Sequence, residues 1–589
     1  MKCYSTIVAF LLLCGISIGA PLDLSNKEVW VGTNSAGHHP GAGTPDDPFA
    51  IDNFRWLIQG MWNGNGTFAQ STNTTLHLLP GVYNIDYTGG STMMSIPDGI
   101  RIVGSGMSNT IVTQSAYSAG TNNDLSVFHN SDPRSSFYIS DLTIDCGWPT
   151  LAGSVKKAGA IDVSSSDVTI ERVRAINFGS AGLPPAIDPG QASAECFVIS
   201  AATPTNSGGS ITIQNCIVEG AHQGGAYGYA SCIKGCSIPG SIAQTNSNII
   251  IRNNHVVGTI RSVALQFAGA NVLIEGNEVS GAIQGINQDT WGGKCVSIIN
   301  NKFVDVGLGI GMGTTYNQGN ISTNWVMPFE SVLITDNSIL LSDFYILNSA
   351  GGSYAGGYYL PTGFRFGGNV QNLLVANNSV RIMPDLRGAT NSSWYFVDIA
   401  DFVSGYTNSN ISLTGNSIEP GMQSFFDSVH LGDDRRAMVY ENDNHYFDGT
   451  AVSLFPYFGY TFSDGLTDYT ISPAPGDHEF TPSIRFSLPT SSGAATGTRV
   501  VHLPDPAAYS GRSYKIIFNK IATTANVGFA IQADANGWGG AFTNQVIIDI
   551  PTGTTKAIGS PLTLYSPGTA AVTNVVTITS IGGGWMVQR

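Results

Sequence analysis

Charged side chains are scarce in this 589-residue chain, where Asp, Glu, Lys and Arg together make up 11% of the residues. The 26 basic residues are outnumbered by 41 acidic ones, which gives a formal net charge of −15. A nucleic-acid or anionic-membrane partner favours a basic surface, so this balance argues against both. An acidic polysaccharide stays compatible, because a few Lys and Arg side chains in one cleft can outweigh a distant acidic surface.

Long apolar runs are equally rare. Residues 1–20 combine Lys2, the apolar run Ile7–Ile18 and the small pair Gly19-Ala20, which is the pattern of a cleaved signal peptide. The run is too short for a bilayer, and no later stretch approaches its length, so we expect no membrane span. The sequence therefore predicts a secreted, periplasmic or cell-surface protein.

Cysteine is sparse, and no His is placed to join the cysteines in binding a metal ion. Beyond residue 20 an even set of thiols is left, which in an oxidising compartment allows one or two disulfides or, equally, buried thiols. The members of this set are Cys146, Cys196, Cys216, Cys232, Cys236 and Cys295. The spacing of Cys232 and Cys236 suits a local staple. No His lies at zinc-ligand spacing from these residues, so we predict no metal site.

A repeated β-rich phrase is what the sequence has in abundance. An alternating apolar run that ends in Asn or Asp, followed by a turn and another strand, returns roughly every 20 to 40 residues, the period of a solenoid. Examples are Ile139–Asp145, Val168–Ile176, Ile211–Val218, Val272–Val279, Val332–Ile339 and Ile411–Ile418. The Asn pairs fall where a left-handed turn residue is tolerated. Each coil must stack on its neighbours to bury its apolar face.

Three segments near the start of the chain are Gly41–Phe49 (GAGTPDDPF), Thr75–Asn84 (TLHLLPGVYN) and Ile100–Gly106 (IRIVGSG). They resemble the entrance coils of the pectin-lyase-like right-handed parallel β-helix superfamily. The resemblance covers roughly residues 40–460 and implies an all-β, right-handed parallel β-helix, for which we set the bounds 21–470. It also implies a capping element, which the short helix expected over Phe54–Met61 supplies. Polysaccharide lyases and glycoside hydrolases are the activities it implies.

The repeats fade towards the C-terminus. Residues 471–497 are rich in Pro, Ser, Thr and Gly and are predicted to be a linker. Longer strands then follow, so residues 498–589 are predicted to form a small β-sandwich-like domain. A carbohydrate-binding module, a module for homo-oligomer formation and a structural cap are all compatible with this domain.

Polar residues between inward apolar ones form a predicted column. Coils of a β-helix rise by about 4.8 Å, so equivalent outward positions align down one face. The column contains Asp162, Lys234, Gln266, Asn287, Asp289, Arg365 and Asp398. Such a row suits the hydroxyls and carboxylates of a sugar polymer lying along the axis. A merely solvated strand face is the alternative for each single residue.

Aromatic residues and one His gather in the long connections that flank this column. Their rings can stack on sugars, or they can pack loops onto the solenoid. The substrate-binding candidates among them are His222, Tyr227, Tyr229, Trp291 and Tyr316. Together with the column they predict an extracellular polysaccharide as partner.

Two reactions compete for this site. Hydrolysis needs a pair of carboxyl groups, for which Asp162, Glu195 and Asp289 are candidates. β-Elimination on a uronic acid needs a base and a cation, for which Lys234 and Arg365, with His222 or Tyr229, are candidates.

The signatures of polygalacturonase-type hydrolases are missing, yet outward acids outnumber outward bases, which slightly favours a hydrolase over a lyase. Lyases of the resembled fold often use Ca²⁺ on clustered carboxylates. No dense Asp/Glu group is present, so no cofactor is predicted. A non-catalytic glycan-binding adhesin or spike is the third alternative.

Overall fold

The computed structural model describes about three fifths of the chain. The described residues are 21–33, 41–65, 67–87, 95–117, 124–130, 134–151, 157–180, 193–201, 209–219, 222–223, 229–237, 247–288, 293–312, 329–342, 361–366, 370–383, 394–399, 409–420, 422–426, 439–450, 458–461, 468–470, 483–487, 497–503, 513–520, 527–533, 546–557, 560–568, 572–580 and 584–588. The predicted signal peptide lies outside them. Two compact units divide the chain, one mainly up to Asn287 and the other mainly from Gln288 onward.

Nearly all regular structure up to residue 446 is β-strand, and these strands belong to one 32-stranded sheet. The N-terminal elements are β1 (Glu28–Thr33), β2 (Phe49–Ile51), α2 (Phe54–Asn63), β3 (Thr75–Leu78), β4 (Gly81–Tyr87), β5 (Ile100–Val103), β6 (Thr110–Tyr117), β7 (Asp124–His129), β8 (Arg134–Asp145), α3 (Trp148–Leu151), β9 (Lys157–Ile176), β10 (Gly179–Ser180), β11 (Ser193–Ala201), β12 (Ser210–Gln214), β13 (Ile217–Glu219), β14 (His222–Gln223), β15 (Tyr229–Ser237), β16 (Asn248–Arg252), β17 (His255–Ala268), β18 (Asn271–Glu275) and β19 (Glu278–Gln288).

The later strands of the same sheet repeat this arrangement. They are β20 (Cys295–Ile299), β21 (Lys302–Met312), β22 (Ser331–Thr335), β23 (Ser338–Leu341), β24 (Thr362–Phe366), β25 (Gln371–Ala376), β26 (Ser379–Ile382), β27 (Tyr395–Ile399), β28 (Ser409–Thr414), β29 (Ser417–Ile418), β30 (Gln423–Phe426), β31 (Val439–Asn442) and β32 (His445–Tyr446).

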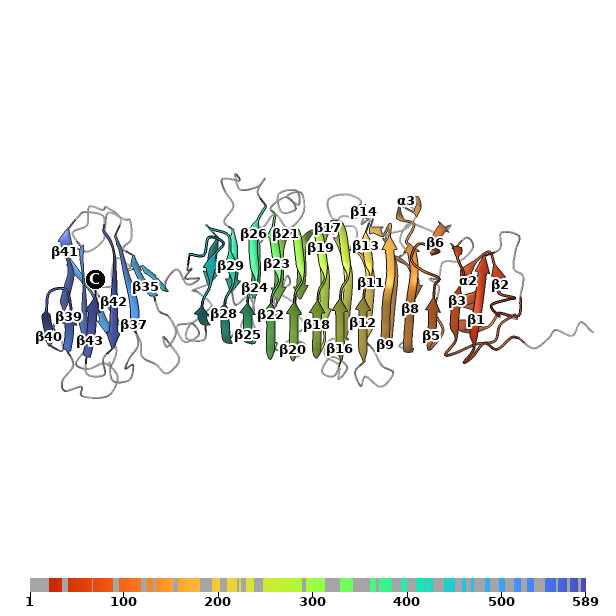
Figure 1. Cartoon of the computed structure of the whole chain (residues 1–589), viewed down its shortest axis with the longest axis horizontal. Helices are drawn as coiled ribbons and strands as arrows, with labels where there is room; N and C mark the ends of the chain where they lie inside the picture. The colour runs from red at the N-terminus through yellow and green to blue at the C-terminus, as the bar shows by residue number, and fades with distance from the viewer. Residues whose placement is uncertain are drawn as a thin grey trace, which may run out of the picture. The chain divides into compact units, whose positions relative to one another are not determined.

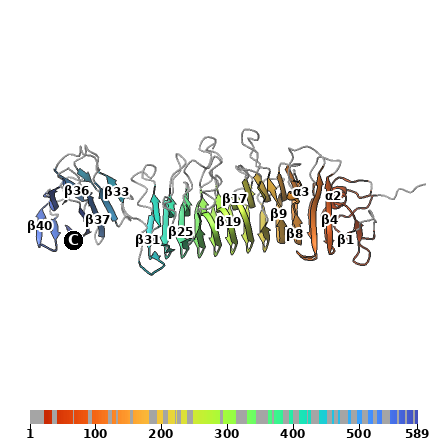
Figure 2. The ribbon, with the colours of Figure 1, turned by 90° about the horizontal axis from the view of Figure 1, so that it is seen from above.

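Successive coils pair in parallel and in register. In the first unit β12, β16 and β18 lie side by side, with Ile211 opposite Ile249 and Ile249 opposite Val272 (Figures 1 and 2). These three side chains point inward and are buried, whereas the residues that alternate with them face outward. The predicted right-handed parallel β-helix is confirmed.

Left-handed residues at one corner of each coil explain the recurring Asn and Asp. The backbone has positive φ at Asn215 (56°), Asn253 (53°) and Gly276 (63°) in the first unit, and at Asp336 (58°) and Asn377 (55°) in the second. Asn, Asp and Gly adopt this region at the lowest cost, because other side chains crowd the following carbonyl. The corner sequence therefore follows from the turn that the solenoid needs.

A ladder of buried amides follows that corner. In the first unit the Asn254 Nδ2 donates to Asn277 Oδ1 (2.9 Å), and Asn277 Nδ2 donates to Asn301 Oδ1 (2.9 Å). The second unit has the same bonds along Asn337, Asn378, Asn416 and Asn444. Each amide also donates to a strand carbonyl, as Asn277 does to Ile251 O at 2.9 Å. These side chains are at most 2% exposed, and their mutual bonds satisfy groups that burial would otherwise leave costly.

A helix covers the start of the solenoid, as the sequence predicted. α2 begins after Asn53, whose side chain accepts from the Arg55 amide (3.0 Å) as an N-cap. Its Phe54, Leu57 and Met61 are fully buried, and the Phe54 ring meets the Phe128 ring edge-on. The helix thus adds an apolar layer to the first coils.

The C-terminal strands form two smaller sheets, as the fold class predicted, and these sheets begin at β33, before residue 498. One sheet has the order β33-β35-β37-β42-β43-β39-β40 and the other β34-β36-β38-β41. Their bounds are β33 (Phe458–Thr461), β34 (Asp468–Thr470), β35 (Ser483–Ser487), β36 (Gly497–Leu503), β37 (Ser513–Lys520), β38 (Val527–Ala533), β39 (Val546–Asp549), β40 (Thr554–Ala557), β41 (Leu562–Gly568), β42 (Val572–Ser580) and β43 (Gly584–Gln588). The segment expected to be a linker, 471–497, contains β35, which pairs with β33 and β37.

Four cysteines do not form the disulfides that the sequence allowed. Cys146, Cys196 and Cys216 are buried thiols, and Cys295 is an exposed thiol. Burial raises the pKa of the Cys216 thiol to about 12, so it stays protonated and packs as an apolar group. The side chains of Cys232 and Cys236 lie outside the described residues, and their staple stays a prediction.

The amide ladder makes a testable demand on stability. Asn277→Ala leaves buried partners of its amide without hydrogen bonds, so we expect it to lower the free energy of unfolding by about 1–3 kcal/mol. The matched control is Asn271→Ala, because Asn271 begins the same strand pair but is exposed. Denaturant unfolding measures both; equal losses for the two variants would contradict the role of the ladder.

Candidate functional site

The strand register aligns the predicted column over successive coils of the first unit. Asp162 of β9 lies opposite Val198 of β11, and Val198 lies opposite Lys234 of β15. Lys234 lies opposite Gln266 of β17, which lies opposite Asn287 of β19. Neighbouring members are therefore separated by one strand spacing, about 4.8 Å. The strand register therefore brings Asp162, Lys234, Gln266 and Asn287 onto one line, and their roles in binding or catalysis stay predictions.

His129 also belongs to this line. We call the line the polar row, and it consists of His129, Asp162, Val198, Lys234, Gln266 and Asn287, with Val198 as an apolar member. His129 ends β7 and lies opposite Asp162, with 3.7 Å between its Nδ1 and Asp162 Oδ2. The His129 side chain is 17% exposed and the Asp162 side chain 39% exposed. This imidazole and carboxylate thus form a partly buried pair at the N-terminal end of the row.

The pleat explains why the row faces outward. Ile161 and Val163 flank Asp162 and are buried in the core, and Leu265 and Phe267 flank Gln266 in the same way. Lys234 and Gln266 are half-buried, and Asn287 is 5% exposed. Along the row the groups change from an acid with an imidazole to a cation and then to neutral amides. Such an order can address a carboxylate at Lys234 and hydroxyls at the amides.

Arg365 and Asp398 lie in the second unit, and they contact each other. Arg365 of β24 lies opposite Asp398 of β27, and its Nε donates to Asp398 Oδ2 at 2.7 Å. Both side chains are largely buried, at 13% and 7% exposure. The Arg365 guanidinium, which we predicted from the sequence to bind a substrate carboxylate, therefore already has the Asp398 carboxylate as its partner. A catalytic role for Arg365 stays a prediction and requires this pair to admit a third group.

Three other candidates are described only by their strand positions. Glu195 lies on β11 opposite Ser231, Tyr229 begins β15 opposite Ser193, and His222 lies on β14 opposite Gly179. Gly179 in turn pairs with Ala158 of β9, so His222 is carried two strands away from the strand that holds Asp162. Tyr227, Asp289, Trp291 and Tyr316 lie outside the described residues, and their roles stay predictions.

His129 is the member of the row that sequence reasoning missed. Its strand, Asp124–His129, lacks the Asn-containing phrase that marks the later coils. The signal available was the apolar pair Val127-Phe128 followed by a polar residue, which many strands share. Only the pairing of β7 with β9 places this imidazole beside Asp162.

Neither a metal cluster nor a membrane helix occurs within the ranges listed above. No group of three His, Cys, Asp or Glu side chains there is arranged to hold an ion. No helix among the same residues has the length and apolarity that crossing a bilayer requires.

No protein-family model matches the sequence, and a search of curated proteins found no match either. Solved structures give distant likenesses to two A-modules of mannuronan C-5 epimerases from Azotobacter vinelandii. The AlgE6 module is 15% identical with a TM-score of 0.34, covering 67% of this chain and 96% of its own. The AlgE4 module is 14% identical with the same TM-score and covers 67% and 92%.

PfbA, a surface adhesin of Streptococcus pneumoniae, is 11% identical with a TM-score of 0.31 and covers 87% of this chain and 90% of its own. Likenesses at these scores carry no argument about function. The assignment of the fold rests on the parallel strand pairing of the chain itself.

The Arg365–Asp398 pair yields a prediction about stability. Asp398→Ala leaves the Arg365 guanidinium buried without its carboxylate, so we expect a loss of about 3–5 kcal/mol in the free energy of unfolding. The double variant Arg365→Met with Asp398→Leu removes both charges and should lose less. Denaturant unfolding of the single and double variants decides; a single variant as stable as the unmodified protein would contradict the importance of the pair.

Proposed function

We propose that this protein is an exported enzyme that binds a uronate-containing polysaccharide along the polar row and cleaves it by β-elimination. One observation supports this above all: Lys234 lies in register beside Gln266 and Asn287, two coils from Asp162. A cation next to neutral hydrogen-bonding amides suits a sugar that carries a carboxylate among its hydroxyls.

The spacing of the row supports a polymer that lies parallel to the solenoid axis. Adjacent positions repeat at about 4.8 Å, which is comparable to the rise of one sugar in an extended chain. Asp162 and Lys234 then address sugars two places apart, and Gln266 and Asn287 address the next ones. A row of this length binds several sugars, so binding energy is available away from the bond that breaks.

The chemistry of elimination assigns a role to Lys234. Its ammonium group pairs with the carboxylate of the uronate and stabilises the negative charge that develops when the C5 proton leaves. The electron pair of that C–H bond forms the C4–C5 double bond while the C4–O4 bond breaks, and the departing oxygen takes up a proton. His222 and Tyr229 are the candidate proton acceptors. Tyr229 lies on β15, the strand of Lys234, and His222 lies on β14, which β10 separates from β9.

Hydrolysis makes a different demand. It needs two carboxyl groups about 6.5–9.5 Å apart for inversion, or closer for retention. Among the described side chains of the polar row Asp162 is the single carboxylate. A hydrolytic mechanism thus depends on Glu195 or Asp289, and the described row favours elimination instead.

Lys234→Ala tests this function. Removal of one charge-stabilising group typically costs about 10²–10³ in kcat, so we expect a loss of that size. The measurement is the ultraviolet absorbance of the unsaturated product formed from a panel of polyuronates. Lys302→Ala is the matched control, because Lys302 is a 59% exposed lysine that pairs with Glu278 outside the row.

The possible products separate the competing activities. Unsaturated product with a strong loss in Lys234→Ala supports elimination at the row. New reducing ends without that absorbance would show a hydrolase, and binding without cleavage of any polymer would show a glycan-binding adhesin. Equal activity of both lysine variants would contradict the role of Lys234.

A further inference from the structure

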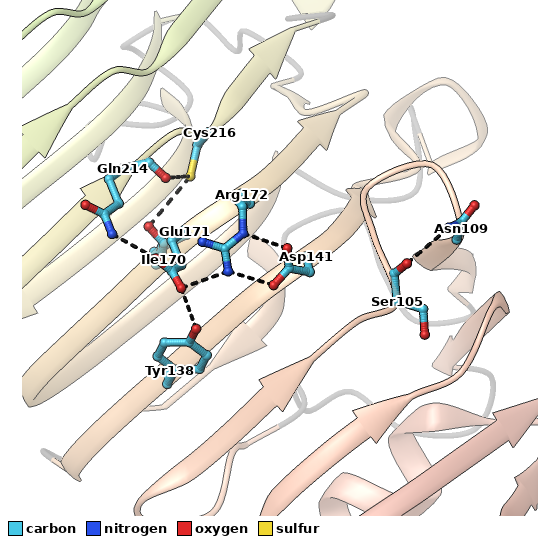
Figure 3. A network of polar contacts seen from close by, with 9 residues as sticks. All are labelled: Ser105, Asn109, Tyr138, Asp141, Ile170, Glu171, Arg172, Gln214 and Cys216. Atoms are coloured by element: carbon cyan, nitrogen blue, oxygen red, sulfur yellow. Dashed lines mark hydrogen bonds and ion pairs between the residues drawn. The ribbon is translucent and has the colours of Figure 1, made fainter. Parts of the chain in front are cut away.

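A network of charged and polar side chains joins the N-terminal coils on the outer face of the first unit (Figure 3). We call it the polar clamp, and it consists of Tyr138, Asp141, Glu171, Arg172, Gln214 and Arg252. It is carried by β8, β9, β12 and β16, which are successive neighbours in the sheet. Glu171 and Arg172 follow Asp162 by nine and ten residues on β9, so one strand serves both the clamp and the polar row.

Arg172 is the centre of the clamp. Its Nε and one of its terminal nitrogens donate to the two carboxylate oxygens of Asp141, at 2.7 and 2.8 Å. The same terminal nitrogen donates to Glu171 Oε1 at 2.9 Å. A bidentate contact of this kind fixes geometry as well as charge. Arg172 has a positive φ of 51°, a backbone conformation that is unfavourable for Arg. The side chain of Arg172 reaches both Asp141 and Glu171 from this corner.

Glu171 extends the clamp to the coils on either side. The Tyr138 hydroxyl donates to Glu171 Oε1 at 2.6 Å, and Gln214 Nε2 donates to Glu171 Oε2 at 2.8 Å. Arg252 Nε donates to Gln214 Oε1 at 2.8 Å, which carries the chain of bonds to one more coil. The clamp thus spans four successive coils.

The clamp lies where the amide ladder is missing. Leu142 and Val173 are opposite each other at the ladder position of their coils, and Cys216 follows in the next coil. The ladder begins one coil later, where the Cys216 amide donates to Asn254 Oδ1 at 3.0 Å. The clamp ends at Arg252, two residues before Asn254. Charged groups that can be protonated therefore replace neutral amides as the side-chain links between these coils.

We propose that the polar clamp is an acid-sensitive joint, which holds the N-terminal coils together near neutral pH and loosens them on acidification. The amide ladders of the later coils do not change charge in this range, so they keep their bonds. The coil that carries Asp162 is then held more firmly above the acid range than within it, whatever reaction the polar row performs.

The charges around the two carboxylates determine the direction of the effect. The hydrogen bond from Arg172 lowers the pKa of Asp141 below its ordinary value of 3.8. Burial raises the pKa of Glu171, but the hydrogen bonds from Tyr138, Gln214 and Arg172 outweigh burial and bring it below 4.5. A carboxyl group whose pKa is lowered in the folded protein stabilises the fold when the pH is above the ordinary pKa of that group. This stabilisation is lost as the pH falls through the lowered pKa.

The other charged groups on the neighbouring strands do not replace this link. Arg101 of β5 lies over the Tyr138 ring, with its Cζ 4.0 Å from the ring centroid. Glu275 of β18 lies opposite Arg252 at the far end of the clamp. Burial and the bond to Glu171 raise the pKa of Tyr138, so its hydroxyl stays a donor throughout the acid range.

Hydrogen exchange measured by mass spectrometry tests the proposal on the full chain. For each peptide, the exchange rate relative to the intrinsic rate is compared at about pH 6 and about pH 3. Each additional proton that the opened state binds changes the opening equilibrium by up to about tenfold per pH unit. We expect peptides from residues 134–145 and 168–176 to lose about tenfold or more in protection. Peptides from 373–382 and 411–418, which contain the ladder members Asn378 and Asn416, should change far less.

The double variant Asp141→Asn with Glu171→Gln keeps the size and planar shape of both groups but removes their titration and one acceptor oxygen of each. Its N-terminal coils should be less protected near neutral pH and should respond little to acid. Glu278→Gln is the control, because Lys302 lowers the pKa of Glu278 in an ion pair outside the clamp, and it should respond to acid like the unmodified protein. Equal acid loss in both sets of peptides, no acid loss at residues 134–176, or an undiminished response in the double variant would overturn the proposal.

Discussion

Parallel hydrogen bonding between consecutive coils is the constraint on which this molecule depends. A single coil cannot bury its own apolar face, so it is stable only against a neighbour in register. The register decides which side chains face the core, because a shift by one residue would reverse every inward and outward position. Buried amides such as Asn277 and Asn378 bond to the same residue type one coil away and so favour a single register. Every alignment of functional groups follows from that register.

Two kinds of side-chain link hold the coils in this register. Neutral amides do so within the core at one corner, where Asn254, Asn277 and Asn301 stack. At the same corner of earlier coils the core position is apolar, and the ion pairs of Arg172 link the coils from outside. Partly exposed ion pairs respond to pH and salt, whereas buried amides do not. The solenoid is thus not uniform in its response to conditions, although its strands repeat.

The fold could be predicted from the sequence because a solenoid repeats its physical demands. The left-handed corner, the alternating strands and the capping helix each leave a local signature, as at Asn253 and in α2. The second Asn of each pair was interpreted as a turn residue, whereas Asn254 and its equivalents are buried ladder members. Local sequence could not separate these roles, because a stacked amide is defined by the coil above it.

The site was predictable where its residues lie within the repeating strands. Asp162, Lys234 and Gln266 stand between inward apolar neighbours, so their common face followed from strand alternation. His129 could not be found this way, and the alternation that placed Arg365 and Asp398 in the column did not show that the two side chains contact each other. The partner of Arg365 is 33 residues away, and the length of the intervening connection hides the register that brings them together.

The account would be tested most directly by a crystal structure with a bound oligouronate that is long enough to span the polar row. We expect the sugar chain to run parallel to the solenoid axis, with one carboxylate at Lys234 and hydroxyls at Gln266. An oligosaccharide that is bound at full occupancy on another face, or that crosses the strands without contact to Lys234, would contradict the account.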